Sequence, residues 1–163
     1  MKKYTILYLL LSLMLSCQDK KTEMEDKFKW QVCTSAPAGY PVHIYDGGLT
    51  TEDAYHSFSD GTVAVSSWGA AGSDMFNGVS FLPQLLHVRW LSYAEGCFYE
   101  VDTELDYDKM LKLFQEGYQE KFGTLGMHKE TYDEIVTGFA PGGVVIVWLA
   151  GGSKQMEVGR YQG

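Results

Sequence analysis

Three carboxylates alternate along one short segment and are the first residues whose spacing suggests chemistry. Glu100, Asp102 and Glu104 are two positions apart, so on a β-strand their side chains share one face. Such a stripe suits a divalent cation or a basic protein partner. We favour a third interpretation, the solvated outer face of a half-buried strand, because polar outer faces are the norm in antiparallel sheets.

No other set of residues has the spacing of a catalytic or metal site. The four histidines are scattered: His43, His56, His87 and His128. The sequence lacks the Gly-x-Ser-x-Gly motif of hydrolases and the Gly-Lys-Ser/Thr motif of phosphate-binding loops. We therefore expect no catalytic residue, no metal and no cofactor. An envelope enzyme whose site is not recognisable in the sequence is the alternative.

Large apolar residues occur in a glycine-rich segment, 68–81, that we expect to be a loop. Trp68, Met75 and Phe76 lie within it and Phe81 ends it. If exposed, these side chains would anchor a protein partner, because aromatic residues and methionine are enriched in binding hot spots. If buried, they fold the loop onto a sheet. We favour burial, because large exposed apolar patches are uncommon.

The first residues of the chain have the pattern of a secretory signal. Lys2 and Lys3 precede an apolar run over 4–15, which is too short to cross a bilayer because a spanning helix needs about 20 apolar residues. Ser16 is a small residue directly before Cys17. The segment 14–17 resembles the lipobox of bacterial lipoproteins, so we expect residues 1–16 to be a signal peptide.

The lipobox resemblance implies a membrane anchor at Cys17. In bacterial lipoproteins this cysteine receives a diacylglycerol, a peptidase cuts before it, and fatty acids such as palmitate are attached. Gln18 stands where Asp would indicate retention at the inner membrane, so we expect a lipid-anchored protein of the cell envelope, at the outer membrane. Residues 17–27 are polar and charged, which predicts a disordered tether after the acylated cysteine.

Residues 28–163 are expected to form a single globular domain. The full chain of 163 residues has a formal net charge of −8, which disfavours a nucleic-acid partner. Strand alternation places Cys33 on an outward face of its strand and Cys97 on the inward, apolar face of another. We therefore favour two free thiols, with a disulfide as the alternative, and two thiols are too few for a structural zinc site.

Periodicity predicts many strands and one helix. Strands are expected at 28–35, 42–45, 62–67, 85–92, 96–105, 132–139, 144–150 and 154–162, and a helix, capped by Asp106, at 107–122. The turn residues at 93–96 predict that the strands at 85–92 and 96–105 form a hairpin. A break is expected at 46–48, and the apolar run at 144–150 predicts a central strand covered on both faces. The resulting prediction is an α+β fold, a mostly antiparallel, bent, sandwich-like sheet with one amphipathic helix packed on it.

Four segments carry a resemblance to a known family. They are APAGYP at 36–41 and the segments 81–100, 105–118 and 140–162. They resemble an uncharacterised bacterial lipoprotein family catalogued as domain of unknown function number 2931. The resemblance runs from about Phe28 onward and implies no site residue, because the family has no assigned activity.

The leading hypothesis is a membrane-anchored bacterial lipoprotein that acts as a non-catalytic binding module. Some members of the resembled family are encoded beside secreted antibacterial effectors. The resemblance therefore implies, as the sharpest version, an immunity-type inhibitor of an envelope-targeting effector. An envelope enzyme and a structural lipoprotein without a specific ligand are the alternatives.

Overall fold

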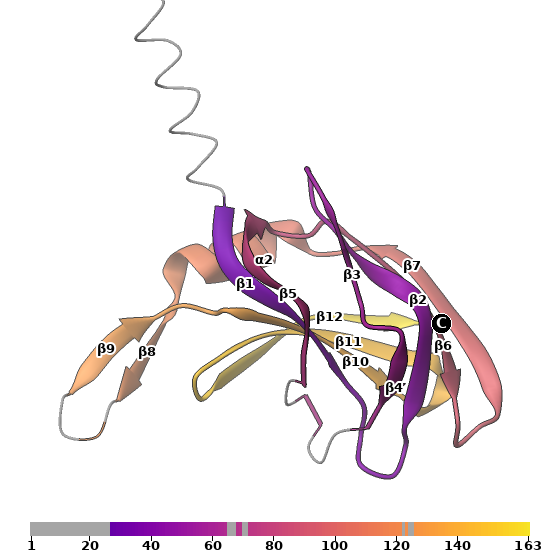
Figure 1. Cartoon of the computed structure of the whole chain (residues 1–163). Coiled ribbons are helices and arrows are strands. Elements are labelled where there is room, and N and C mark those ends of the chain that lie inside the picture. The colour runs from indigo at the N-terminus through magenta and orange to yellow at the C-terminus, as the bar shows by residue number, and fades with distance from the viewer. Residues whose placement is uncertain (1–26, 65–67, 70–71, 122, 124–125) are drawn as a thin grey trace, which may run out of the picture.

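A computed structural model describes residues 27–64, 68–69, 72–121, 123 and 126–163 (Figure 1). Most of these residues lie in strands, which form two large sheets and one small one. The first sheet has the order β12 (Lys154–Gln162), β11 (Val144–Gly151), β10 (Glu134–Ala140), β1 (Lys27–Ser35) and β5 (Gly72–Phe81). Strands β1 and β10 pair in parallel, whereas the other pairs of this sheet are antiparallel.

The second sheet is antiparallel. Its order is β3 (Tyr55–Ser57), β2 (Val42–Thr50), β6 (Leu85–Ser92) and β7 (Cys97–Glu104), and β4 (Gly61–Val63) also pairs with β2. The predicted hairpin of β6 and β7 is confirmed in full register, from Leu85 opposite Glu104 to Ser92 opposite Cys97. This hairpin positions most of the candidate surface described below.

A single large cluster of buried side chains joins the two large sheets. It includes Trp30 from β1, Ile44 from β2, Trp90 from β6 and Phe139 from β10. The ring of Phe139 lies 5.2 Å from that of Trp90 and 6.3 Å from that of Phe58. Burial of large apolar surface from both sheets in one cluster is the main stabilising contribution to this fold.

Strand β11 is covered on both faces, as its unbroken apolar sequence predicts. Val145, Val147 and Leu149 belong to the large cluster. Ile146 and Trp148 point the other way, into a smaller cluster that also contains Cys33. Cys33 is buried, Cys97 is half-buried, and the two form no disulfide.

The helix is shorter than its apolar periodicity predicts. Helix α2 (Tyr107–Glu116) begins at Asp106, whose Oδ1 accepts a hydrogen bond of 3.1 Å from the backbone N–H of Lys109. It ends at Gly117, and the chain continues as β8 (Tyr118–Lys121), which pairs with β9 (Met127–Glu130). The predicted helix over 107–122 is therefore wrong beyond Glu116. Figure 1 shows the β8–β9 hairpin projecting from the side of the molecule.

The expectation of an α+β fold built on one bent, sandwich-like sheet is wrong, whereas the predicted packing of the amphipathic helix is confirmed by the burial of Met110 and Phe114 in the core. In the described residues the chain is mostly β, with its strands divided among three sheets, one ten-residue helix, and a short 3-10 turn, η1 (Pro141–Gly143). The physical reason is that two glycine-rich segments pair as strands. Residues 72–81, expected to be part of a loop, form β5, and the expected break at 46–48 lies inside β2.

Strand β2 continues through its glycines because Gly47 allows close packing against β6 and Gly48 allows it against β3. The β2–β6 register shifts between Ile44 and Asp46. Gly47 has a φ of +152°, and a Cβ on it would lie 2.7 Å from the carbonyl oxygen of His87. A larger residue at position 47 would therefore separate the two strands. The resulting irregularity lies beside Tyr45 and Asp46, two residues of the candidate surface.

Candidate interaction surface

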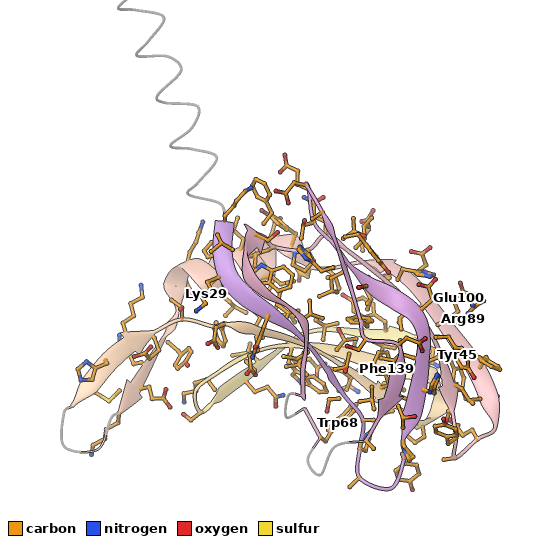
Figure 2. The ribbon with its side chains drawn as sticks, viewed as in Figure 1. Lys29, Tyr45, Trp68, Arg89, Glu100 and Phe139 are labelled. Atoms are coloured by element: carbon orange, nitrogen blue, oxygen red, sulfur yellow. The ribbon has the colours of Figure 1, made fainter. Side chains whose placement is uncertain are left out.

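The candidate surface is the solvent-facing side of the second sheet, which we call the outer face. Along β6, Leu86, Val88 and Trp90 point into the core and the residues between them point outward. The same alternation along β7 turns Phe98, Glu100, Asp102 and Glu104 toward solvent. Figure 2 shows Tyr45, Arg89 and Glu100 close together on this sheet.

An aromatic patch occupies one end of the outer face. It consists of His43, Tyr45, Tyr93 and Phe98. The ring centroids of Tyr45 and Phe98 are 5.3 Å apart, those of His43 and Tyr45 are 4.5 Å apart, and those of His43 and Tyr93 are 6.4 Å apart. Despite these contacts Phe98 is 59% exposed, Tyr93 50% and Tyr45 47%. Two strands and one turn thus bring together four rings, three of which stay about half exposed to solvent.

Charged side chains lie beside the patch and form what we call the charged row. Arg89 is in register with Glu100 on one side and Asp46 on the other, and His87 is in register with Asp102. The His87 ring nitrogens lie 3.8 Å from Asp46 Oδ2 and 4.0 Å from Asp102 Oδ2. Exposed pairs at such distances stabilise a fold by only about 0–1 kcal/mol. These carboxylates can therefore exchange their present neighbours for a partner at little cost.

The acidic stripe lies where strand alternation places it. Glu100, Asp102 and Glu104 are all exposed on one face of β7. Within the described ranges, no group of three or more His, Cys, Asp or Glu side chains is arranged to hold a metal ion. The cation-site interpretation of the stripe therefore has no geometric support in that part of the chain.

Trp68 lies away from the outer face. Figure 2 shows it separated from Tyr45 and Glu100. It is 36% exposed, and its ring contacts Trp148 of the first sheet. Met75 and Phe76, the other two predicted partner-binding residues, lie in β5, and their side chains are outside the described part of the structure. The structure thus does not bring Trp68 together with the acidic stripe.

Sequence reasoning missed the aromatic patch. A signal for Phe98 was present, because it occupies the same alternating positions as the acidic stripe and is therefore an apolar ring on a polar face. Tyr45 was missed because the chain was expected to break at 46–48. No local pattern could have joined Tyr93 to His43, since their rings meet only through the β2–β6 pairing.

The turn between β6 and β7 fixes the end of the sheet that carries the patch. The Glu95 carboxylate accepts hydrogen bonds from Ser92 Oγ at 2.8 Å, from Tyr99 Oη at 3.2 Å and from the backbone N–H of Gly142 at 2.9 Å. The bonds from Ser92 and then Gly142 hold the pKa of Glu95 below its usual range. The contact with Cys97, followed by burial, raises the pKa of Tyr99. A charged Glu95 therefore links this hairpin to η1.

The predicted anchor residue, Cys17, lies outside the described residues, so its lipidation stays a prediction. Over the parts of the chain that the structure describes, no helix has the length and apolar character required to cross a bilayer.

Comparison with known proteins identifies a family and no characterised relative. The family described as protein of unknown function (DUF2931) matches residues 17–163. No curated protein matches the chain, and no solved structure does. The match confirms the resemblance carried by the four sequence segments. It assigns no activity, so the function must be argued from the geometry of the surface.

Proposed function

The chain belongs to the DUF2931 family, whose function is unknown, and from this premise we propose that it is a lipid-anchored binding module that recognises a protein partner through its outer face. The aromatic patch is the observation that carries the proposal. A side chain as large as Phe98, left 59% exposed, has apolar surface whose burial in an interface would be favourable by about 25 cal/mol per Å².

The composition of the patch suits a protein interface. Tyrosine and other aromatic residues are enriched in binding hot spots, where they supply large contact area with few rotatable bonds. Tyr45 and Tyr93 each combine an exposed ring with a hydroxyl group, so they can pack against apolar groups and also form hydrogen bonds. The ring contacts between Tyr45 and its neighbours limit its rotamers before binding, which lowers the entropic cost of association.

The charge of the surface indicates a basic partner. Asp46 and Asp102 of the charged row are 64% and 79% exposed at their side chains, and Glu104 extends the acidic side chains along β7. The chain as a whole has a formal net charge of −8. Complementary potentials accelerate association and select against partners of the same sign.

The anchor at Cys17 would hold this module in the cell envelope, at the outer membrane. Within this proposal the partner is a secreted effector that attacks the envelope, and the protein acts as its immunity-type inhibitor. Binding alone, with no chemical step, is sufficient for that role. It requires a module held where the effector arrives, with a surface that binds it tightly.

Partner capture followed by affinity measurement tests the proposal. The mature chain is used to capture proteins from an envelope lysate and products of neighbouring genes, and the affinity of a stoichiometric partner is then measured. Phe98→Ala and Tyr45→Ala should each weaken binding by about 2 kcal/mol, roughly 30-fold. The matched control is Met127→Ala, because Met127 is 61% exposed and lies on β9, away from the outer face.

Two results would contradict the proposal. A partner whose affinity is the same for wild type, Phe98→Ala and Tyr45→Ala would show that the outer face is not the binding surface. Cells that lack the protein and yet resist the captured effector would show that the protein is not an inhibitor.

A further inference from the structure

A recessed site, separate from the outer face, lies on the first sheet at the β11–β12 hairpin. The pocket has a volume of about 390 Å³ and is lined by Trp68, Gly69, Glu134, Ala150 and residues 151–155. Its volume is within the range of small-molecule sites, about 300–1,000 Å³. It shares no residue with the outer face.

The indole of Trp68 is held edge-on against the sheet. Its centroid lies 5.0 Å from that of Trp148, with the two ring planes at 88°. The absence of a side chain at Gly138 makes room for both rings, because a Cβ there would lie 2.9 Å from Trp68 Cη2. The Cη2 edge of the indole therefore lies against Gly138 of the sheet, and the ring also contributes to the pocket lining.

Two hydrogen bonds fix the backbone next to Trp68. The N–H of Gly69 donates to Ser35 Oγ at 3.0 Å, and Gln155 Nε2 donates to the carbonyl oxygen of Gly69 at 2.8 Å. These bonds connect Gly69 to β1 and β12. The ring at the pocket wall is therefore preorganised for a ligand.

The remaining lining supplies both donors and acceptors with balanced charge. Glu134 has one oxygen in a 2.8 Å hydrogen bond from Gln31 Nε2, and its carboxylate is an acceptor. Lys154 and the hydroxyl of Ser153 are donors at the opposite strand and turn. Gly152 lies at the turn, where an added Cβ would meet the Glu120 carboxylate, and that carboxylate also accepts a 3.1 Å hydrogen bond from the backbone N–H of Ser153.

We infer that this pocket binds a neutral saccharide, with one sugar ring stacked on the Trp68 indole and its hydroxyls bonded to Glu134, Lys154 and Gln155. A pyranose has an apolar C–H face that fits a flat aromatic ring. Its hydroxyls both donate and accept, which matches the mixed lining. A phosphorylated ligand fits worse, because its charge calls for several cations and Lys154 is opposed here by Glu134.

This inference goes beyond the proposed protein-binding function and stands independently of it, because the two sites lie on different sheets. Saccharide binding at the pocket would let the module hold a glycan while the outer face binds a protein. Loss of one activity by substitution would leave the other intact.

Titration of the mature chain with oligosaccharides tests the inference. The probes are tetrasaccharides of N-acetylglucosamine, of glucose and of mannose, and their binding is measured by calorimetry. The titration extends to about 10 mM, because single sugar sites often bind near the millimolar range, where ΔG is about −4 kcal/mol. We expect at least one probe to bind saturably. Trp68→Ala should weaken that binding tenfold or more, Trp68→Phe less, and Glu134→Gln several-fold.

Tyr55→Ala is the matched control, because the Tyr55 side chain is 50% exposed and lies on β3 of the other sheet. This variant should bind the oligosaccharide with the affinity of wild type. Glu134→Gln keeps the test valid if Trp68→Ala does not fold. No saturable binding of any probe would overturn the inference, and so would binding that neither Trp68→Phe nor Glu134→Gln weakens.

Discussion

At the residue scale, Phe98 and Val101 lie three positions apart on β7 and have opposite environments. Val101 is 4% exposed and packs in the core, whereas Phe98 is 59% exposed. Strand alternation assigns the two residues to different faces, so burial at each site follows from its parity along the strand and not from its hydrophobicity. The contact of Phe98 with Tyr45 shields part of a ring that its outward position would otherwise leave in solvent.

The charge of Glu95 gives a prediction about acid stability. Hydrogen bonds from Ser92, Gly142 and Tyr99 lower the folded-state pKa of Glu95 below its ordinary value of 4.5. Glu95→Gln should therefore lower the melting temperature at neutral pH. A depressed folded pKa stabilises the fold above the unfolded pKa, and this contribution is lost as the pH falls through the folded value. The difference between wild type and variant should thus shrink below about pH 4.5.

Thermal melts across the acid range check this expectation. Glu52→Gln is the control, because Glu52 is an exposed acidic residue of the turn between β2 and β3. Its melting temperature should stay close to that of wild type at every pH. A Glu95→Gln difference that stays constant from neutral to strongly acidic pH would show that the charge of Glu95 contributes nothing.

At the element scale, backbone conformation ends the helix before its apolar pattern does. The pattern that includes Met110 and Phe114 continues to Phe122, but α2 ends at Glu116. Gly117 has φ 61° and ψ −158°, a region that is essentially restricted to glycine. Sequence periodicity reports which side chains are apolar and not which backbone angles are strained, so it could predict the helix and its Asp106 cap but not its last residue.

Gly117→Ala is predicted to be strongly destabilising. Its backbone conformation disfavours any Cβ by roughly 1–3 kcal/mol, and a Cβ there would also meet the carbonyl oxygen of Glu130. We expect a loss of about 2–4 kcal/mol in the free energy of unfolding, measured by urea denaturation.

Gly96→Ala is the matched control, because Gly96 has a φ of +65° with nothing within 4 Å of the added Cβ. Its cost should be close to the backbone penalty alone, about 1–2 kcal/mol. Equal costs at the two glycines would mean that the contact with Glu130 is irrelevant.

Local pairings could be predicted from the sequence, and distant ones could not. The β6–β7 hairpin was predicted because alternation and a turn lie within one short segment. The parallel pairing of β1 with β10 joins distant parts of the chain, and nothing in either segment specifies the other. The candidate site divides in the same way, since the acidic stripe lies within β7 whereas the aromatic patch needs the register of β2 with β6.

At the scale of the whole molecule, Phe139 tests whether the two large sheets unfold together. It belongs to the first sheet and contacts Trp90 of the second, and it is fully buried. Phe139→Ala should lower the free energy of unfolding by about 3–5 kcal/mol through lost burial and a residual cavity. Denaturation followed by tryptophan fluorescence and by circular dichroism should give one coincident transition.

Phe98→Ala serves as the control for Phe139, because it removes the same side chain from an exposed position. Its cost should be under about 1 kcal/mol. Transitions that separate between the two probes would show that the sheets are independent units despite their shared core.

The proposed anchor makes the whole molecule a membrane-attached module, and Cys17→Ala is its direct test. Only a thiol can form the thioether to diacylglycerol, so the variant should lack lipid. Wild type should incorporate labelled palmitate and fractionate with the outer membrane, while the variant should be unlabelled and absent from that fraction. Cys97→Ala, which removes a different cysteine, should keep both properties. A Cys17→Ala variant that stays in the outer-membrane fraction would mean that something other than lipid holds the protein there. With an unlipidated protein, the outer face would still bind its partner but no longer at the membrane, so protection should fail while affinity in solution is unchanged.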